Sequence, residues 1–168
     1  DAFLTDRTIN MLTTLRGEVK IVINNTLPYN KKCTEFDNEN EFFRTLRKRI
    51  VSDNKKLVSI WGTVKAAVPF HETLTRLNVS NELYHRTSDS KIKARDMADV
   101  NTHWAGKQCI GYTGTITVGI NYTNQESKFN QMSLYASAWG PGARDYAQAL
   151  HRAREITDNE LLLFIHPS

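Results

Sequence analysis

Five histidines are the side chains of this chain best suited to bind a metal ion or to move a proton near neutral pH. They are His71, His85, His103, His151 and His166. No pair forms the His-Glu-x-x-His or His-x-His pattern that would place two imidazoles on one metal ion. We therefore expect no metal site and no cofactor.

The glycine-containing motifs also lack the features of catalytic loops. Gly140-Pro141-Gly142 and Gly111-x-x-Gly114 are not followed by Gly-Lys-Ser/Thr, and neither opens a helix as Gly-x-Gly-x-x-Gly. The sequence has no Gly-x-Ser-x-Gly nucleophile elbow. These observations predict that the protein is not an enzyme and has no catalytic residues.

One catalytic alternative stays open. Glu18-Val19-Lys20 could form the acidic-x-Lys half of a metal-dependent nuclease site. Alternating surface charges on a half-exposed strand explain the same three residues, and such a short pattern arises often by chance. The alternative predicts cleavage that depends on a divalent ion and is abolished by Lys20→Ala.

A cluster of basic residues gives the strongest physical signal. Residues 44–56 contain six cations and one carboxylate, that of Asp53, which gives a local net charge of +5. Lys31 and Lys32 precede this segment. Anionic lipid or a phosphate backbone would attract such a cluster. An ordinary solvated helix face is the competing interpretation. The six cations are Arg44, Arg47, Lys48, Arg49, Lys55 and Lys56.

Val68-Pro69-Phe70 is the second candidate site. If Pro69 ends a helix, Phe70 lies in the following loop, where it could insert into a membrane or dock on a neighbouring molecule. The alternative is that Phe70 folds back over the core, as large aromatic side chains commonly do.

The elements that would position these residues follow from the spacing of apolar side chains. Alternation predicts strands at 18–23 and 112–122, and a further strand at 161–165. Asn38, with Glu41 three residues later, is typical of a helix N-terminus, and the apolar positions up to Ile50 continue that helix. The spacing also predicts helices at 57–68 and 143–156, and two short strands around 77–79 and 83–84.

This order of elements predicts an α+β fold, with an antiparallel sheet covered by two helices from the N-terminal half and one C-terminal helix. The 168 residues fit one domain, residues 1–168, with 1–15 as an extended arm and 88–107 as a long loop. Apolar residues make up 40% and charged residues 24%, which excludes wholesale disorder. The longest apolar run has five residues, too short for a membrane-spanning helix.

The segment order resembles the matrix proteins of rhabdoviruses, of the vesiculovirus type and its plant-virus relatives. The resemblance rests on residues 19–29, which read VKIVINNTLPY, on residues 110–117, which read IGYTGTIT, and on the helix at 143–156 before the closing strand. It covers most of residues 15–165. The Pro-Pro-x-Tyr budding motif of the family is absent from the sequence.

The resemblance implies a structural viral protein that self-associates, condenses the viral nucleocapsid and links it to the envelope membrane during assembly and budding. Its partners would be further copies of itself, the nucleocapsid, anionic membrane lipid and the tail of the envelope glycoprotein. It would lie beneath the virion envelope, in the host cytoplasm and on the inner face of host membranes. The basic cluster, with Lys31 and Lys32, would contact membrane and nucleocapsid, and Val68-Pro69-Phe70 would serve self-association or membrane contact.

A different class of function also fits the basic cluster. A small basic accessory protein could bind RNA or nucleoprotein without any affinity for membranes. Binding that falls with salt and shows no preference for acidic vesicles would favour this alternative.

Overall fold

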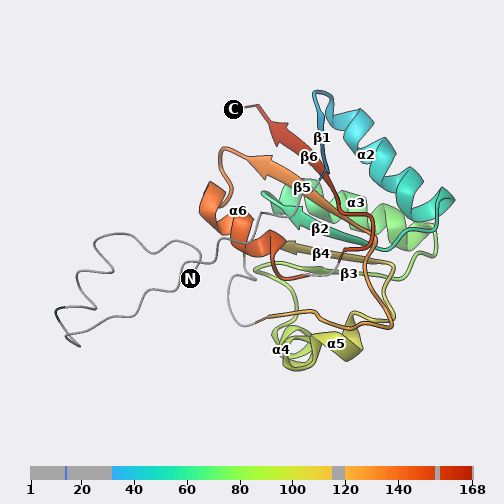
Figure 1. Cartoon of the computed structure of the whole chain (residues 1–168), viewed down its shortest axis with the longest axis vertical. Helices are drawn as coiled ribbons and strands as arrows, with labels where there is room; N and C mark the ends of the chain where they lie inside the picture. The colour runs from blue at the N-terminus through green and yellow to red at the C-terminus, as the bar shows by residue number, and fades with distance from the viewer. Residues whose placement is uncertain (1–13, 15–31, 115–119, 154–155, 168) are drawn as a thin grey trace.

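Six parallel strands form one sheet in the computed structural model, which describes residues 14, 32–114, 120–153 and 156–167 (Figure 1). The strand order is β1-β6-β5-β2-β4-β3, and every neighbouring pair runs parallel. The predicted antiparallel α+β fold is therefore wrong, because the chain has a parallel α/β fold. The strands are β1 (Lys32–Phe36), β2 (Leu57–Trp61), β3 (Asn81–Tyr84), β4 (Cys109–Thr113), β5 (Gln131–Ser137) and β6 (Glu160–His166).

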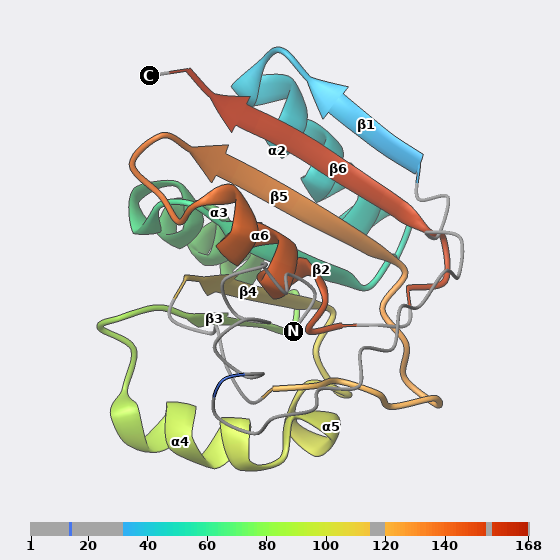
Figure 2. The same cartoon turned by 60° about the vertical axis from the view of Figure 1, so that its left-hand side comes forward.

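Helices cover both faces of this sheet. The helix α2 (Glu39–Arg47), its π-helical continuation η1 (Lys48–Ser52) and α3 (Val64–Arg76) lie on one face. Figure 2 shows α6 (Ala143–Leu150) in front of the opposite face. Because both faces are covered, all five residues of β2 are buried, as parallel sheets require. The remaining helices are α4 (Ser90–Ala98) and α5 (Val100–His103).

The core is divided by the sheet into two clusters. Val58 and Ile60 of β2 pack with Trp104 and with Tyr146 of α6 on one face. Leu57 and Trp61 of the same strand pack on the other face, against α2 and α3. Successive side chains of a strand point to opposite faces, so β2 supplies apolar side chains to both clusters.

The helix predicted after Asn38 is confirmed. The side-chain oxygen of Asn38 accepts a hydrogen bond from the backbone nitrogen of Glu41 at 3.1 Å. Phe42, Leu46 and Ile50 recur every four residues and are fully buried. The cap and the apolar stripe therefore define this helix locally.

The helix predicted at 57–68 is wrong. Leu57–Trp61 forms β2, and α3 begins only after Thr63, whose hydroxyl accepts a hydrogen bond from the nitrogen of Ala66. Pro69 lies inside α3 and does not end it. The apolar spacing of residues 57–64 fits a strand buried on both faces as well as it fits a helix, and this ambiguity caused the error.

Several other predicted elements change. Residues 88–107 contain α4 and α5 where a long loop was expected. The predicted strand at 112–122 starts earlier and ends at Thr113, and residues 115–119 lie outside the described part. The C-terminal helix ends at Leu150, whereas the closing strand is confirmed as β6. The strand predicted at 18–23 and the arm at 1–15 fall outside the described residues, apart from Thr14.

Candidate functional site

The carboxyl ends of β2 and β5 lie side by side in the middle of the sheet, with Trp61 beside Tyr135. After β2 the chain passes through α3 to β3 at one edge, whereas after β5 it passes through α6 to β6 on the other side. The two connections therefore diverge to opposite faces of the sheet, which makes the boundary between β2 and β5 its topological switch point. In open parallel sheets, ligands bind at such a switch point.

Two glycines let these loops approach each other. A Cβ atom on Gly140 would collide with the hydroxyl of Tyr146 and would lie 3.0 Å from the Cα of Gly62. A Cβ atom on Gly62 would collide with the same hydroxyl and would lie 2.9 Å from the backbone nitrogen of Ser137. Only glycine fits at both positions, so the main chains of the two loops pack closely against each other.

The loop after β4 reaches the same place. A Cβ atom on Gly114 would lie 2.7 Å from Cγ of Pro141, in the loop after β5. The loops that follow three adjacent strands, β5, β2 and β4, thus meet at one end of the sheet.

Trp139 is the most exposed large apolar side chain of the described residues, with 89% of its surface accessible. Its backbone is held in a turn, because the nitrogens of Trp139 and Gly140 donate hydrogen bonds to the side chain and the carbonyl of Ser137. The other two tryptophans, Trp61 and Trp104, are buried in the core. An exposed indole held on a fixed turn at the switch point of the sheet is suited to stack on a planar group such as a nucleobase.

Exposed cations follow three of the strands at this carboxyl edge. Lys65 lies in the first turn of α3 after β2, Arg86 follows β3, and Arg144 lies in the first turn of α6 after β5. Together with Trp139 they combine positive charge with an aromatic platform, the combination that binds single-stranded nucleic acid.

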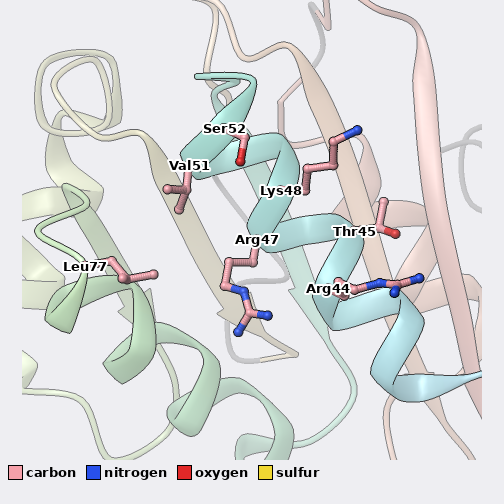
Figure 3. Close-up of a pocket in the computed structure, with 7 residues that line it drawn as sticks. All are labelled: Arg44, Thr45, Arg47, Lys48, Val51, Ser52 and Leu77. Atoms are coloured by element: carbon pink, nitrogen blue, oxygen red, sulfur yellow. The ribbon is translucent and has the colours of Figure 1, made fainter.

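The predicted basic cluster divides into two groups. Arg44, Arg47 and Lys48 are exposed on α2 and η1, and within the described part of the chain no ion pair neutralises them. They line an open pocket of about 550 Å³ with Val51 and Leu77 (Figure 3). This pocket lies at the end of α2 away from the carboxyl edge.

The other predicted cations form ion pairs or hydrogen bonds within the fold. Arg49 pairs with Asp53 at 3.6 Å and with Glu160 at 3.7 Å, and Lys55 pairs with Asp158 at 2.9 Å.

Lys56 and Lys32 also have partners. The ammonium group of Lys56 donates to the carbonyl oxygen of Ala105 at 2.6 Å and to the hydroxyl of Ser127, and burial lowers the pKa of Lys56. Lys32 lies 3.5 Å from Glu160, and Lys31 lies outside the described residues.

Val68, Pro69 and Phe70 do not form a loop. They lie in the middle of α3, and Phe70 is only 7% exposed in the core between α2 and α3. The alternative in which Phe70 packs into the core is thus the one observed.

The described residues contain neither a metal-binding cluster nor a membrane-spanning helix. They include no group of three or more His, Cys, Asp or Glu side chains placed to hold a metal ion. None of their helices is long and apolar enough to cross a membrane. Glu18 and Lys20 lie outside this part of the chain.

Sequence reasoning missed the carboxyl-edge residues, above all Gly62, Trp139 and Tyr146. The local signal was present, because Gly62-Thr63 and Trp139-Gly140-Pro141-Gly142 each end an apolar run and precede a helix. Only the parallel strand order shows that these two turns are neighbours.

A family profile described as origin of replication binding protein, of the herpesvirus type, matches residues 1–168. The chain belongs to this family. No curated protein matches the sequence.

Solved structures with the same fold include an ATPase domain and a DEAD-box protein. S. cerevisiae Dbp5 bound to RNA and ADP BeF3 aligns with a TM-score of 0.68 and 13% identity, over 100% of this chain and 44% of that one. The C-terminal domain of the DEAD-box protein Dbp5 aligns with a TM-score of 0.55 and 12% identity, over 82% of this chain and 76% of that one.

The C-terminal part of the Fun30 ATPase domain aligns with a TM-score of 0.52 and 15% identity, over 74% of this chain and 39% of that one. The chain thus has a RecA-like α/β fold, and it spans less than half of the Fun30 structure and of the RNA-bound Dbp5 structure.

These findings correct the functional predictions made from the sequence. The family and the fold contradict a rhabdovirus matrix protein, its nucleocapsid, membrane-lipid and glycoprotein partners, and its place beneath the virion envelope. They do not support the alternative of a small accessory protein that binds RNA or nucleoprotein. The family match, together with a fold that ATPase and DEAD-box domains share, also contradicts the prediction of a non-enzymatic protein. The resemblance rested on short strands and a helix, which occur in many unrelated folds.

Proposed function

We propose that this chain is a RecA-like domain of a helicase-type enzyme that acts at replication origins, and that its carboxyl edge contacts single-stranded DNA. The observation that carries the proposal is Trp139, which is 89% exposed on the turn between β5 and α6, at the β2–β5 switch point of the sheet. Base stacking on such an indole needs no particular sequence, which suits a protein that moves along a strand.

Family membership supports DNA as the nucleic acid, since the family is described by its binding to replication origins. The related Dbp5 structure, solved with RNA and ADP BeF3, supports a nucleotide-dependent action on a nucleic acid strand. Because the chain spans 44% of that structure, unwinding driven by nucleotide hydrolysis is proposed for the whole enzyme. Strand contact is proposed for the carboxyl edge of this chain.

The cations at the edge would attract the phosphate backbone. Lys65, Arg86 and Arg144 follow strands whose carboxyl ends face the same side, so a DNA strand laid across β5, β2, β4 and β3 would meet positive charge along its path. Each phosphate contact on single-stranded DNA adds about 0.7 to the slope of log affinity against log salt. Binding should therefore weaken markedly as salt rises.

Fluorescence anisotropy with a labelled oligothymidylate tests the proposal. Trp139→Ala should raise the Kd about five- to a hundredfold, because stacking one base contributes about 1–3 kcal/mol. Leu77→Ala is the matched control, since Leu77 is an exposed apolar side chain (46% accessible) at the other end of the sheet. Equal affinities of the wild type and Trp139→Ala would overturn the proposal.

A further inference from the structure

A groove between α2 and α3 lies on one helical face of the sheet, away from the carboxyl edge. The 550 Å³ pocket of Figure 3 forms one part of it, and a smaller hollow of about 180 Å³ between Phe43, Pro69 and Phe70 forms the other. Arg47 lines both hollows, which makes them parts of one groove. We call it the α2–α3 groove.

Positive charge on this groove is not neutralised within the described part of the chain. Arg44, Arg47 and Lys48 carry three charges on one turn of helix, and the nearby ion pairs of Arg49 and Arg76 involve other side chains. In Figure 3 Arg47 extends toward α3, whereas Arg44 and Lys48 extend along the other flank of α2. Arginine forks of this kind bind carboxylates through two parallel hydrogen bonds.

The rim of the groove is apolar. Val51 and Leu77 are exposed by 45% and 46%, although both are large hydrophobic residues, and each lines the pocket. The chain around Val51 adopts a π-helical turn, Lys48–Ser52. Such turns are rare and frequently mark functional positions in helices.

From these observations we infer that the α2–α3 groove docks an acidic amphipathic segment of a partner protein. Carboxylates of the segment pair with Arg44, Arg47 and Lys48, and its apolar side chains cover Val51 and Leu77. A helix that lays apolar and acidic residues at i, i+3 and i+4 into a groove has the required pattern. The site lies apart from the carboxyl edge, so the inference does not depend on the proposed DNA contact.

A nucleic acid backbone fits this groove less well. The ends of η1 and α3 beside Val51 and Leu77 present carbonyl groups, which disfavour phosphate and carboxylate alike, so the helix dipole does not distinguish the two ligands. A phosphate chain, however, offers nothing apolar to cover those two side chains. The combination of free cations with an exposed apolar rim therefore favours a protein segment.

Selection from a phage-displayed library of random peptides, each about 16 residues or four helical turns long, tests the inference on the full chain. Binders are selected on the wild type and counter-selected on Arg44→Glu/Arg47→Glu. The expected result is enrichment of peptides with acidic residues and apolar residues at helical spacing. No enrichment, or enriched peptides without an acidic bias, would overturn the inference.

Affinities of one enriched peptide, made synthetically, then locate the site. Arg44→Glu/Arg47→Glu and Val51→Ser/Leu77→Ser should each weaken binding about tenfold or more. The matched control Lys91→Glu/Lys93→Glu changes the net charge equally on α4, which lies on a different part of the molecule, and should leave the affinity unchanged.

Two results would contradict the docking site. If Lys91→Glu/Lys93→Glu weakened peptide binding as much as Arg44→Glu/Arg47→Glu, the effect would be one of net charge alone. The second result concerns a labelled oligothymidylate. If Arg44→Glu/Arg47→Glu weakened its binding, and Val51→Ser/Leu77→Ser changed neither oligonucleotide nor peptide binding, the groove would be a phosphate site instead. The Trp139→Ala oligonucleotide measurement is independent of both, so failure of one site does not imply failure of the other.

Discussion

The hydroxyl oxygen of Tyr146 lies 3.2 Å from the backbone nitrogen of Ser137 and accepts its hydrogen bond. Tyr146 belongs to α6 and is 8% exposed, and Ser137 is the last residue of β5. This bond ties the helix to the end of the strand across the turn that presents Trp139. Burial raises the pKa of Tyr146, although the hydrogen bond from the Ser137 nitrogen lowers it in part.

Gly140→Ala should destabilise the protein by about 1–3 kcal/mol, because the added methyl group collides with the hydroxyl of Tyr146. In a Tyr146→Phe background the same substitution should cost less, since the colliding oxygen is gone. Urea unfolding of the four proteins of this double-mutant cycle measures the coupling. Gly106→Ala is the control, because nothing lies within 4 Å of a Cβ atom there. Additive free energies in the cycle would show that the two residues do not touch as described.

His71 should make the protein less stable in mild acid. Its Nδ1 lies 2.8 Å from Oδ1 of Asn81, and burial lowers the pKa of the ring from 6.5 to about 4, although the Asn81 hydrogen bond raises it in part. Below pH 6.5 the unfolded chain binds a proton that the folded chain does not, so stability is present above that pH and falls down to about pH 4. The expected loss between pH 7 and about pH 5 is about 2 kcal/mol.

Comparison with His71→Gln isolates this contribution from the other histidines. The free energy of unfolding in urea is measured for both proteins at the two pH values. The variant should lose about 2 kcal/mol less than the wild type over this interval. Parallel pH profiles would contradict a buried neutral imidazole at this position.

Asp96→Asn should loosen α4 and α5 from the sheet. The buried carboxylate accepts hydrogen bonds from Tyr84 at 2.9 Å and from Arg95 at 2.9 Å, and His103 Nδ1 lies 3.4 Å away. Burial alone would raise the pKa of Asp96, but the bonds from Arg95 and Tyr84 outweigh it and lower the pKa. An uncharged amide loses these charge-assisted bonds at a cost of about 1–3 kcal/mol.

Hydrogen exchange of the backbone amides measures the effect of Asp96→Asn. Exchange should accelerate in α4 and α5 more than in β5, because the described hydrogen bonds and ion pairs of Asp96 involve no residue of β5. Glu72→Gln is the control, since Glu72 is exposed and makes one surface ion pair with Arg76. Uniform acceleration over the sheet and helices would argue against a local role.

Two lysines of the basic cluster should differ in their effect on stability. Lys56→Ala removes hydrogen bonds from a charged group to the Ala105 carbonyl and the Ser127 hydroxyl and should cost about 1–2 kcal/mol, although the Ser127 hydroxyl still donates to that carbonyl. Lys48→Ala removes an exposed side chain and should change stability by about 0.5 kcal/mol or less. Thermal unfolding measures the stability of both variants. Equal losses of stability would contradict the division of the basic cluster into bonded and exposed side chains.

Local signals predicted some elements of this fold correctly. The helix α2 is specified within its own residues, by the Asn38 cap and by the four-residue spacing of Phe42, Leu46 and Ile50. The closing strand β6 was also predictable, because an apolar run follows a turn at Asn159. The strand order was not predictable, since it depends on contacts between segments far apart in the chain.

The parallel sheet explains the main errors. Leu57–Trp61 is buried on both faces, so it lacks the alternation that marks a half-exposed strand, and its spacing imitated a helix. The charges of Arg49 and Lys55 could be counted from the sequence, but their partners Glu160 and Asp158 lie more than a hundred positions away. Trp139 attracted no prediction, because only the strand order places its turn beside the end of β2.

Intrinsic tryptophan emission is the most direct test of strand binding at the carboxyl edge. Trp61 and Trp104 are buried, so a change on adding oligothymidylate reports Trp139. We predict that oligothymidylate quenches the tryptophan emission of the wild type saturably. In Trp139→Phe the quenching should be absent, while anisotropy still detects weaker binding. Oligothymidylate that binds by anisotropy without changing the emission of Trp139 would show that the strand lies elsewhere, and would contradict the proposed function of this edge.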